Sequence, residues 1–509
     1  MAPEAPALDS GAPSASESSM PRAPLLLVVV ASVSILSASC SSDPSSAAGD
    51  DASPCASDPS CVDGGDLEGG GDATVDGSPD VLGDGAGDGG GPDATPIPCG
   101  TSAWATYGHD GRRTFATDAC IKGPLSVSWS YTPAPPTGRT TKAMHHALAQ
   151  KDAVFLQWGA SIEPYVGTTA LDRVSTTGTR VWTMDTGSDA NEGNWGSLIG
   201  GNVWLDDDGV YLVDAASGVR GATTGVDWWG QSIPNGAGAF LVVTSKSDGP
   251  GLFVASLDDK LKTLWKQNEQ GTHCGDGFAD TMGGIALDGG VLFYAPNYNT
   301  GSTKTLDFAS GLYAFDASSG APKWKIPTTP SSVISAGDGL VYLIESSTTL
   351  IARKQSDGSK VWSVDVTNVG AQAPVLAGGL AIVGTATDVL AFDAKTGAPA
   401  WTSKVSGAAA RAYTIDISNG CSGLQHQGAA IATSIAAALG SGTLIVTGSD
   451  GVHVLDLATG VEQWKGAVTG AKGSLHDPIA VGDVVYVVDS SPTPIGGFSS
   501  GALFSLKKP

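Results

Sequence analysis

Residues 314–324 (AFDASSGAPKW) and 391–401 (AFDAKTGAPAW) have nearly the same sequence, and this repeat decides the fold. A third copy, residues 454–464 (VLDLATGVEQW), keeps the Asp, the Thr, the Gly and the Trp in place. In each copy an apolar run leads to an Asp that can bond the following backbone, and a Gly closes a tight turn. The Trp follows the Gly by four residues on the next apolar run. Each copy therefore predicts a β-hairpin.

With the weaker copies, this hairpin recurs at intervals of 38 to 63 residues. A unit of about 40 residues suits one four-stranded propeller blade, and the longer units are expected to carry insertions. A large ring at one fixed place in a sheet repeat is expected to pack between neighbouring sheets. One unit has Ala222 in the Trp position, and the expected blade tryptophans are Trp129, Trp182, Trp265, Trp324, Trp362, Trp401 and Trp464.

The end of the chain predicts how the ring closes. Residues 501–506 (GALFSL) match the apolar run of residues 311–315 (GLYAF), but the chain then stops without a further Trp. The strand carrying Trp129 would supply the missing partner, so that no sheet edge stays open within that blade. We therefore predict an all-β, eight-bladed β-propeller of four-stranded antiparallel blades, closed by pairing of the N- and C-terminal strands.

The charge is unevenly distributed. The chain has 27 Lys plus Arg against 51 Asp plus Glu, a formal net charge of −24, and residues 41–98 hold 13 of the acidic residues but no basic ones. This Gly- and Asp-rich stretch has little apolar surface to bury, so we predict a disordered acidic linker. The acidic balance argues against a nucleic-acid partner, which requires a basic surface.

The N-terminal residues predict export. Arg22 precedes an apolar run, residues 25–36, that is short for a membrane span, and the small residues 37–39 then lead to Cys40. This ending resembles the lipobox of bacterial lipoproteins, which implies lipidation of Cys40. Ordinary cleavage that leaves Cys40 as a free thiol is the alternative. The expected organisation is a leader with a lipoprotein-type signal peptide (1–40), the linker (41–98) and the propeller (99–509).

Six further cysteines form an even set, which in an exported chain suggests disulfides. Their pairing stays open, with neighbours as the simplest candidates: Cys55 with Cys61, Cys99 with Cys120, and Cys274 with Cys421. The last pair would join two insertions over the channel mouth. No C-x-x-C spacing is present, so a zinc or thioredoxin-type site is not indicated.

The repeats resemble the PQQ-like (quinoprotein-type) β-propeller family, whose A-x-D-x-x-T-G-x-x-x-W signature is quoted above. Residues 104–110 (WATYGHD) also look like the opening of such propellers. The resemblance implies a non-catalytic lipoprotein similar to the propeller subunit of the outer-membrane β-barrel assembly machinery, or a periplasmic quinoprotein alcohol dehydrogenase. In the dehydrogenases, a disulfide between adjacent cysteines covers pyrroloquinoline quinone (PQQ) above a calcium ion and a catalytic Asp. This chain has no adjacent cysteines, so no catalytic residue is assigned and PQQ with calcium belongs to the alternative only.

A propeller's ligand site is expected at the channel mouth, where the innermost strands begin. Aligned units place these residues there: His145, His146, Asn194, Trp195, Trp228, Trp229, Gln372, His476 and Asp477. Because the first and last blades are neighbours, three of the histidines and the Asp could converge on a metal. A ligand-free solvated mouth and a small-molecule or peptide site are the other interpretations, and no metal is assigned.

These features predict a monomeric propeller, exported and lipid-anchored to the outer membrane on its periplasmic or outer face. Its expected partner is another envelope protein or a peptide, and the lipid is its only expected membrane contact. We favour a non-enzymatic scaffold. The alternatives are a PQQ-dependent alcohol or sugar dehydrogenase and a carbohydrate-binding module that stacks sugars on Trp195, Trp228 and Trp229.

Overall fold

The computed structural model describes residues 97–509 except 135–139, 163–165, 186–195, 207–209, 224–227, 245–251, 269–283, 296–310, 347, 368, 370–371, 406–413, 417–424, 428–433, 449 and 493–497. The expected signal peptide, the linker up to residue 96 and five of the seven cysteines (Cys40, Cys55, Cys61, Cys274 and Cys421) lie outside the described residues. Within the described part, no helix has the length and apolar character that crossing a bilayer requires.

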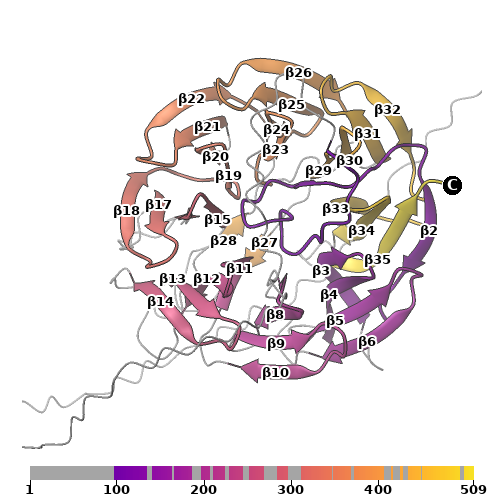
Figure 1. Ribbon diagram of the computed structural model, residues 1–509. Coiled ribbons are helices and arrows are strands. Elements are labelled where there is room, and N and C mark those ends of the chain that lie inside the picture. Colours follow the sequence, from indigo (N-terminus) through magenta and orange to yellow (C-terminus); the bar gives the residue numbers. More distant parts are fainter. Residues whose placement is uncertain are drawn as a thin grey trace, which may run out of the picture. The chain divides into compact units, whose positions relative to one another are not determined.

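The described chain forms eight antiparallel sheets arranged as blades around a central axis (Figure 1), which confirms the predicted propeller. In each of the first seven blades the chain runs from the innermost strand to the outermost. The first four blades are β3 (Thr140–Gln150), β4 (Ala153–Ile162), β5 (Val166–Ser175) and β6 (Arg180–Asp185); β7 (Ser197–Ile199), β8 (Asn202–Asp206), β9 (Val210–Asp214) and β10 (Arg220–Thr223); β11 (Trp228–Pro234), β12 (Gly238–Thr244), β13 (Leu252–Asp258) and β14 (Thr263–Asn268); and β15 (Ile285–Asp288), β16 (Val291–Tyr294), β17 (Gly311–Asp316) and β18 (Pro322–Pro327).

Blades 5 to 8 continue the ring, and blade 7 gains a short inner strand, β1 (Ala116–Thr117), parallel to β29. These blades are β19 (Ser335–Gly337), β20 (Leu340–Glu345), β21 (Thr349–Lys354) and β22 (Lys360–Asp365); β23 (Val375–Ala377), β24 (Leu380–Gly384), β25 (Asp388–Asp393) and β26 (Pro399–Lys404); β29 (Ser434–Ala438), β30 (Thr443–Gly448), β31 (Gly451–Asp456) and β32 (Glu462–Gly466); and β33 (Ser474–Val481), β34 (Val484–Pro492), β35 (Phe498–Lys507) and β2 (Ser126–Tyr131). A separate hairpin, β27 (Thr414–Asp416) with β28 (Gln425–Gln427), lies in the insertion between blades 6 and 7.

The ring closes through blade 8, where the N-terminal strand β2 pairs antiparallel with the C-terminal strand β35. The register runs from Ser126 opposite Lys507 to Tyr131 opposite Leu503. The two chain ends therefore complete one sheet, as the end of the sequence predicted.

In six blades the recurring Trp packs across the blade boundary onto the turn of the next blade. Trp129 donates its Nε1–H to Thr176 O at 2.8 Å, and a Cβ at Gly178 would come within 2.9 Å of its ring. Gly178 has φ +80°, so the turn needs Gly both for its backbone and for the room it leaves the ring. The same contact joins Trp182 with Gly218, Trp265 with Gly320, Trp324 with Gly358, Trp362 with Gly397, and Trp401 with Gly460, while Trp464 packs on Gly123.

The unit that has Ala222 in the Trp position fills the space between blades 2 and 3 with a different side chain. The turn of blade 3, which would receive the missing Trp, has no Gly; Leu261 stands there with φ +64°. Its side chain is buried with Trp204 and Leu212 of blade 2. Leu261 therefore fills space that a Trp plate fills at the other boundaries.

The repeated Asp shapes the turn that precedes the Trp strand. Asp393 Oδ1 accepts hydrogen bonds from Thr396 N at 2.8 Å and Thr396 Oγ1 at 2.7 Å, and Asp456 does the same with Thr459. The equivalent bonds from Ser318 and Ser319 lower the pKa of Asp316 to about 2. These carboxylates therefore stabilise the turn, as the sequence predicted.

Candidate functional site: a channel filled by the chain itself

A stretch of the chain's own N-terminal segment occupies the propeller axis. Residues 100–119, here called the plug, run around the inside of the ring before the chain reaches β2, and appear as the indigo trace at the centre of Figure 1. Trp104 exchanges two backbone hydrogen bonds with Ala149 of blade 1, and Leu198 N of blade 2 donates to Ala105 O. In blade 3, Ser232 O accepts from Thr106 Oγ1 at 2.7 Å.

The plug then contacts the remaining blades in order. Each of four inner strands donates one backbone N–H to a plug carbonyl: Leu287 to Gly111, Ala336 to Arg112, Leu376 to Thr114, and Ala437 to Phe115. The circuit ends where Cys120 N donates to Gly482 O in blade 8. The hydrogen bonds of the plug and of Cys120 thus reach all eight blades, so this segment acts as a hub for the ring.

Arg113 carries a fully buried charge inside the hub. Its Nε donates to Ile285 O at 2.9 Å, its Nη1 donates to Tyr107 O, and its Nη2 lies 3.4 Å from Ser232 O. Burial lowers the pKa of Arg113 to about 9, against the opposing influence of Tyr107 and Asp110. Carbonyl oxygens from the plug and from two blades therefore hold this guanidinium, which stabilises a charge that would otherwise be costly to bury.

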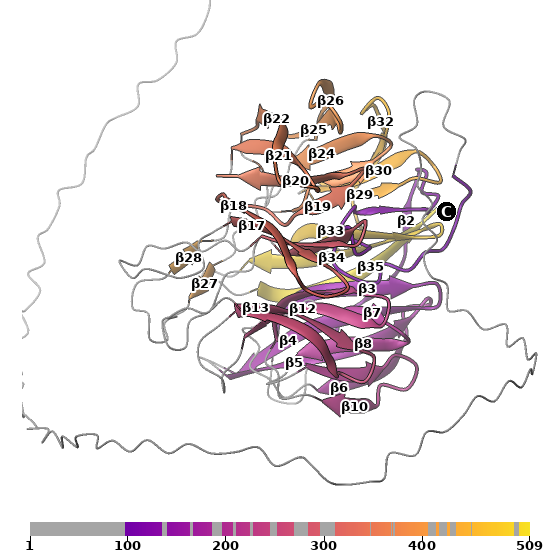
Figure 2. The same cartoon turned by 60° about the vertical axis from the view of Figure 1, so that its left-hand side comes forward.

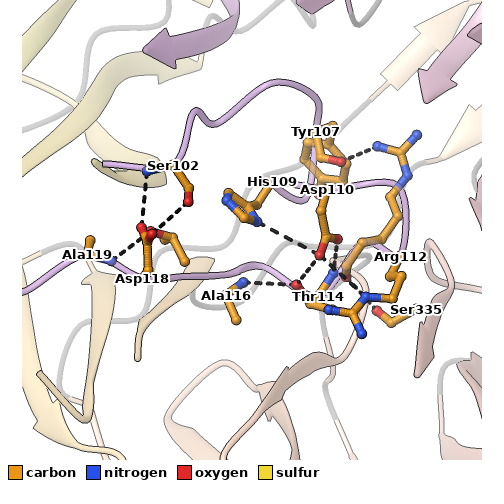
Figure 3. Close-up of polar contacts among 12 residues, drawn as sticks. Ser102, Tyr107, His109, Asp110, Arg112, Thr114, Ala116, Asp118, Ala119 and Ser335 are labelled. Carbon is orange, nitrogen blue, oxygen red and sulfur yellow. Dashed lines mark hydrogen bonds and ion pairs between the residues drawn. The ribbon is translucent and has the colours of Figure 1, made fainter. Parts of the chain in front are cut away.

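His109 lies within the loop of the plug, between Asp110 and Asp118 (Figure 3). Both of its ring nitrogens are buried and have no hydrogen-bond partner among the described residues. Nδ1 lies 3.9 Å from Asp110 Oδ2, while Thr114 N and Oγ1 occupy the Asp110 carboxylate. Burial is the main cause that lowers the pKa of His109, which favours the neutral form of the imidazole.

The ends of the plug are fastened to each other. Cys99 and Cys120 form a disulfide, the neighbour pair that the sequence suggested. Gly100 N donates to Asp118 O, and Ser102 N and Oγ bond the Asp118 carboxylate at 3.1 and 2.7 Å. The plug is therefore a covalently closed loop at the face where the innermost strands end, which we call the tether face.

The opposite face, the mouth face, holds three of the predicted site residues whose side chains are described. Gln372 bonds the backbone of Ile435 twice, through Nε2 to O at 2.6 Å and through Oε1 from N at 2.9 Å. His476 Nδ1 lies 3.0 Å from Asp477 Oδ2. Asp477 has φ +48° beside a register shift in β33, so a backbone irregularity marks this part of the mouth.

For the other predicted mouth residues, the structure describes the backbone alone or describes nothing. His145 and His146 lie in β3, and Trp228 and Trp229 lie in β11, but their side chains are outside the described part. Asn194, Trp195, Cys274 and Cys421 fall in segments that the structure does not describe. Convergence of the histidines and the pairing of Cys274 with Cys421 therefore stay predictions.

A small hollow separates the mouth from the plug. Its floor is aromatic and comes from the plug, where the Tyr107 and Phe115 rings meet edge to face with centroids 5.1 Å apart. Its lining consists of Trp104, Tyr107, Phe115, Gln372, Ile435, Asp477, Pro478 and Ile479. The plug thus closes the channel below the mouth and joins two predicted mouth residues, Gln372 and Asp477, in one concave surface.

Two of the described mouth residues already have protein partners. In the mouth, the amide of Gln372 is occupied by a neighbouring backbone, and His476 is hydrogen-bonded to Asp477. Among the residues that the structure describes, no three His, Cys, Asp or Glu side chains are grouped to hold a metal ion.

The sequence interpretation missed the role of the plug. The signal was present in residues 104–110 (WATYGHD), which were noted only as an opening motif. The segment lacks strand alternation, and its partners are backbone groups scattered over separate blades, so no local pattern indicates its path.

Comparisons with known proteins agree with this architecture. Residues 251–418 match the family model described as outer membrane protein assembly factor BamB. Among solved structures, the chain is similar to quinohemoprotein alcohol dehydrogenase from Comamonas testosteroni (12% identity, 80% of each chain covered, TM-score 0.55) and to a europium-containing methanol dehydrogenase (12% identity, 80% of this chain and 98% of that chain, TM-score 0.53). BamB from Moraxella catarrhalis is also similar (13% identity, 75% of this chain and 100% of that chain, TM-score 0.43). No curated protein was found to match the sequence. At these identities, the structural likeness shows the fold alone.

Proposed function

Because the repeats of this chain belong to the BamB-like, PQQ-type β-propeller repeat family, we propose that it is an exported, lipid-anchored scaffold that binds another protein of the bacterial envelope. The observation that carries the proposal is the match of residues 251–418 to a family described as an outer-membrane assembly factor. The matched stretch begins in blade 3 and continues through blades 4 to 6, where the repeat signature is strongest.

The filled channel supports binding at the surface of the ring. Trp104 and Phe115 are 2% and 4% exposed, so the axis is packed with the protein's own side chains. A partner would then contact the loops of the mouth face. The hairpin β27–β28 stands off one side of the ring in Figure 2, with the chain's entry near β2 on the other side.

Anchoring follows from the sequence, in which Cys40 ends a lipobox-like signal. A flexible tether of 58 residues has a root-mean-square reach of roughly 40 Å. The propeller would then stand off the outer membrane, with no membrane contact other than its lipid. Metabolic lipid labelling should be lost in Cys40→Ser, and labelling that persists in this variant contradicts the anchor.

The partner proposal can be tested by crosslinking in intact envelopes from the two ends of one strand. β25 begins beside the exposed Thr387 on the mouth face and ends beside the exposed Lys395 on the tether face. A photoreactive residue at Thr387 should capture one reproducible envelope protein, while the same residue at Lys395 serves as the matched control. Equal capture from both positions, or capture from neither, contradicts docking on the mouth face.

The dehydrogenase alternative makes a separate prediction. It requires that PQQ with calcium binds the purified chain and supports dye-linked oxidation of alcohols or sugars. Since the amide of Gln372 and the imidazole of His476 already have protein partners, we expect no saturable change in PQQ absorbance on titration. Saturable binding with activity would replace the scaffold proposal.

A further inference from the structure

We propose that the Cys99–Cys120 disulfide is a mechanical clasp, which passes tension from the N-terminal tether directly to Cys120 and so keeps the plug in the channel. The inference rests on the tethering part of the proposed function and adds a role for the closed loop. The chain enters the described structure at Ile97, which is 45% exposed, two residues before the disulfide. Any pull on the preceding chain therefore reaches Cys99 before it reaches the plug.

Without the disulfide, the tension would act on the N-terminal end of the plug, which is held to the blades by few hydrogen bonds. The hydrogen bonds described for Gly100 and Ser102 all go to Asp118, which is itself part of the loop. The first hydrogen bonds to a blade are those of Trp104 with Ala149. Beyond them, each blade holds the plug by one or a few bonds, each with a net worth of about 1 kcal/mol. A segment loaded from one end breaks such bonds one after another.

With the disulfide, the tension acts on Cys120, where hydrogen bonds to two blades hold the chain. Cys120 N donates to Gly482 O in blade 8 at 2.8 Å. In blade 7, Ser441 Oγ accepts from Ile121 N at 2.9 Å, and Thr443 Oγ1 donates to Ile121 O at 2.8 Å. Ile121 is fully buried in the core shared by these blades, and the chain soon continues into β2. The load is therefore spread over blades 7 and 8.

The clasp also explains why the bond spans the whole plug. The two cysteines are 21 residues apart in sequence, and every hydrogen bond from the plug to the blades lies between them. The disulfide therefore removes the entire hub from the path of the tension. A bond that enclosed only part of the plug would leave some hub contacts under load.

The test is to pull the full mature chain by its two ends in optical tweezers, comparing the oxidised protein with the double variant Cys99→Ser, Cys120→Ser. We expect the variant to show an early extension of about 70 Å, since the released loop of 21 residues gains ~3.3–3.6 Å per residue. The oxidised protein should lack this step. An early step of this size in the oxidised protein, or its absence from the variant, overturns the proposal.

Two controls separate the clasp from a folding defect. Without load, the amides of Ala336 and Leu376, which bond plug carbonyls, should be protected from hydrogen exchange equally in both proteins. Loss of protection in the unloaded variant would mean that the disulfide holds the plug at rest, and would overturn the clasp. Cys274→Ser, which leaves the clasp intact, should lack the early extension under load, as the unchanged protein does. Because no partner is present, a failure here is distinct from a failure to find one in envelopes.

Discussion

The indole nitrogen of Trp401 donates a hydrogen bond to the carbonyl oxygen of Leu457, 3.1 Å away across the boundary between blades 6 and 7. Four other blade tryptophans donate in the same way to the following blade: Trp129, Trp265, Trp324 and Trp362. The Trp of the repeat therefore has two roles. Its ring fills the space between sheets, and its nitrogen fixes the turn against which it packs.

Substituting Gly460 should test the packing part of this role. A Cβ at Gly460 would overlap the Trp401 ring, and the residue also has φ +70°. Gly442 in the same blade has φ +64° but open space around its Cβ position, so Gly442→Ala carries only the backbone cost of about 1 kcal/mol. We expect Gly460→Ala to lower the free energy of unfolding by about 1–3 kcal/mol more, measured by urea denaturation. Equal losses would contradict the Trp contact.

The hydrogen-bond part can be tested with two Trp→Phe variants. Trp401 Nε1 has its acceptor in Leu457 O, whereas Trp182 Nε1 is buried without a partner among the described residues. Trp401→Phe leaves the buried Leu457 carbonyl unsatisfied, while Trp182→Phe removes an unsatisfied donor. Trp401→Phe should therefore cost about 1 kcal/mol more in urea denaturation. A larger loss in Trp182→Phe would show that ring volume alone decides.

The stability of the plug should depend on pH through His109. Burial lowers its pKa below 6.5, opposed by Asp110 and Asp118 and reinforced by Arg112. The unfolded chain therefore takes up this proton more readily, so the free energy of unfolding falls as pH drops below about 6.5. His109→Asn, which tolerates the φ of +77° at this position, should remove that part of the pH dependence. Parallel curves for the two proteins between pH 7 and pH 5 would contradict this assignment.

Replacing the buried guanidinium should loosen the hub. Arg113→Met keeps much of the side-chain volume but leaves the carbonyls of Tyr107 and Ile285 without these donors. A loss of roughly 2–4 kcal/mol in the free energy of unfolding is expected, since buried acceptors become unsatisfied. Arg112→Met is the matched control, because its side chain is 49% exposed and should change stability by less than about 0.5 kcal/mol. If both variants unfold alike, Arg113 does not hold the hub.

The sequence predicted the blades of the propeller and their closure, but it did not predict the plug that fills the channel. The copies ending in Trp324, Trp401 and Trp464 predicted the fold because each repeat must bury its Trp against the next, which imposes a regular spacing. The pairing of β2 with β35 followed from the missing last Trp. Gln372 and Asp477, which the alignment of repeats gave equivalent places, line one hollow in the structure.

The path of the plug and the hydrogen-bond partners of the mouth residues could be determined only from the structure. Arg113 lies in a polar stretch of the sequence, where a charged side chain is ordinarily exposed. In the structure it is fully buried, because its N–H groups donate to carbonyl groups of blades 3 and 4. Gln372 reads as a candidate ligand contact, but its amide bonds the backbone of Ile435. In both cases the deciding neighbours lie more than 60 residues away in sequence, where no local pattern reaches.

Hydrogen exchange of three inner-strand amides tests most directly the central claim that the chain's own plug holds the channel closed. Ala336, Leu376 and Ala437 donate their backbone N–H to Arg112, Thr114 and Phe115 of the plug. We predict that these amides exchange only through openings close in free energy to global unfolding. Exchange at the rate of exposed turns, in a protein whose blades remain protected, would show that the plug leaves the channel readily and would contradict the account.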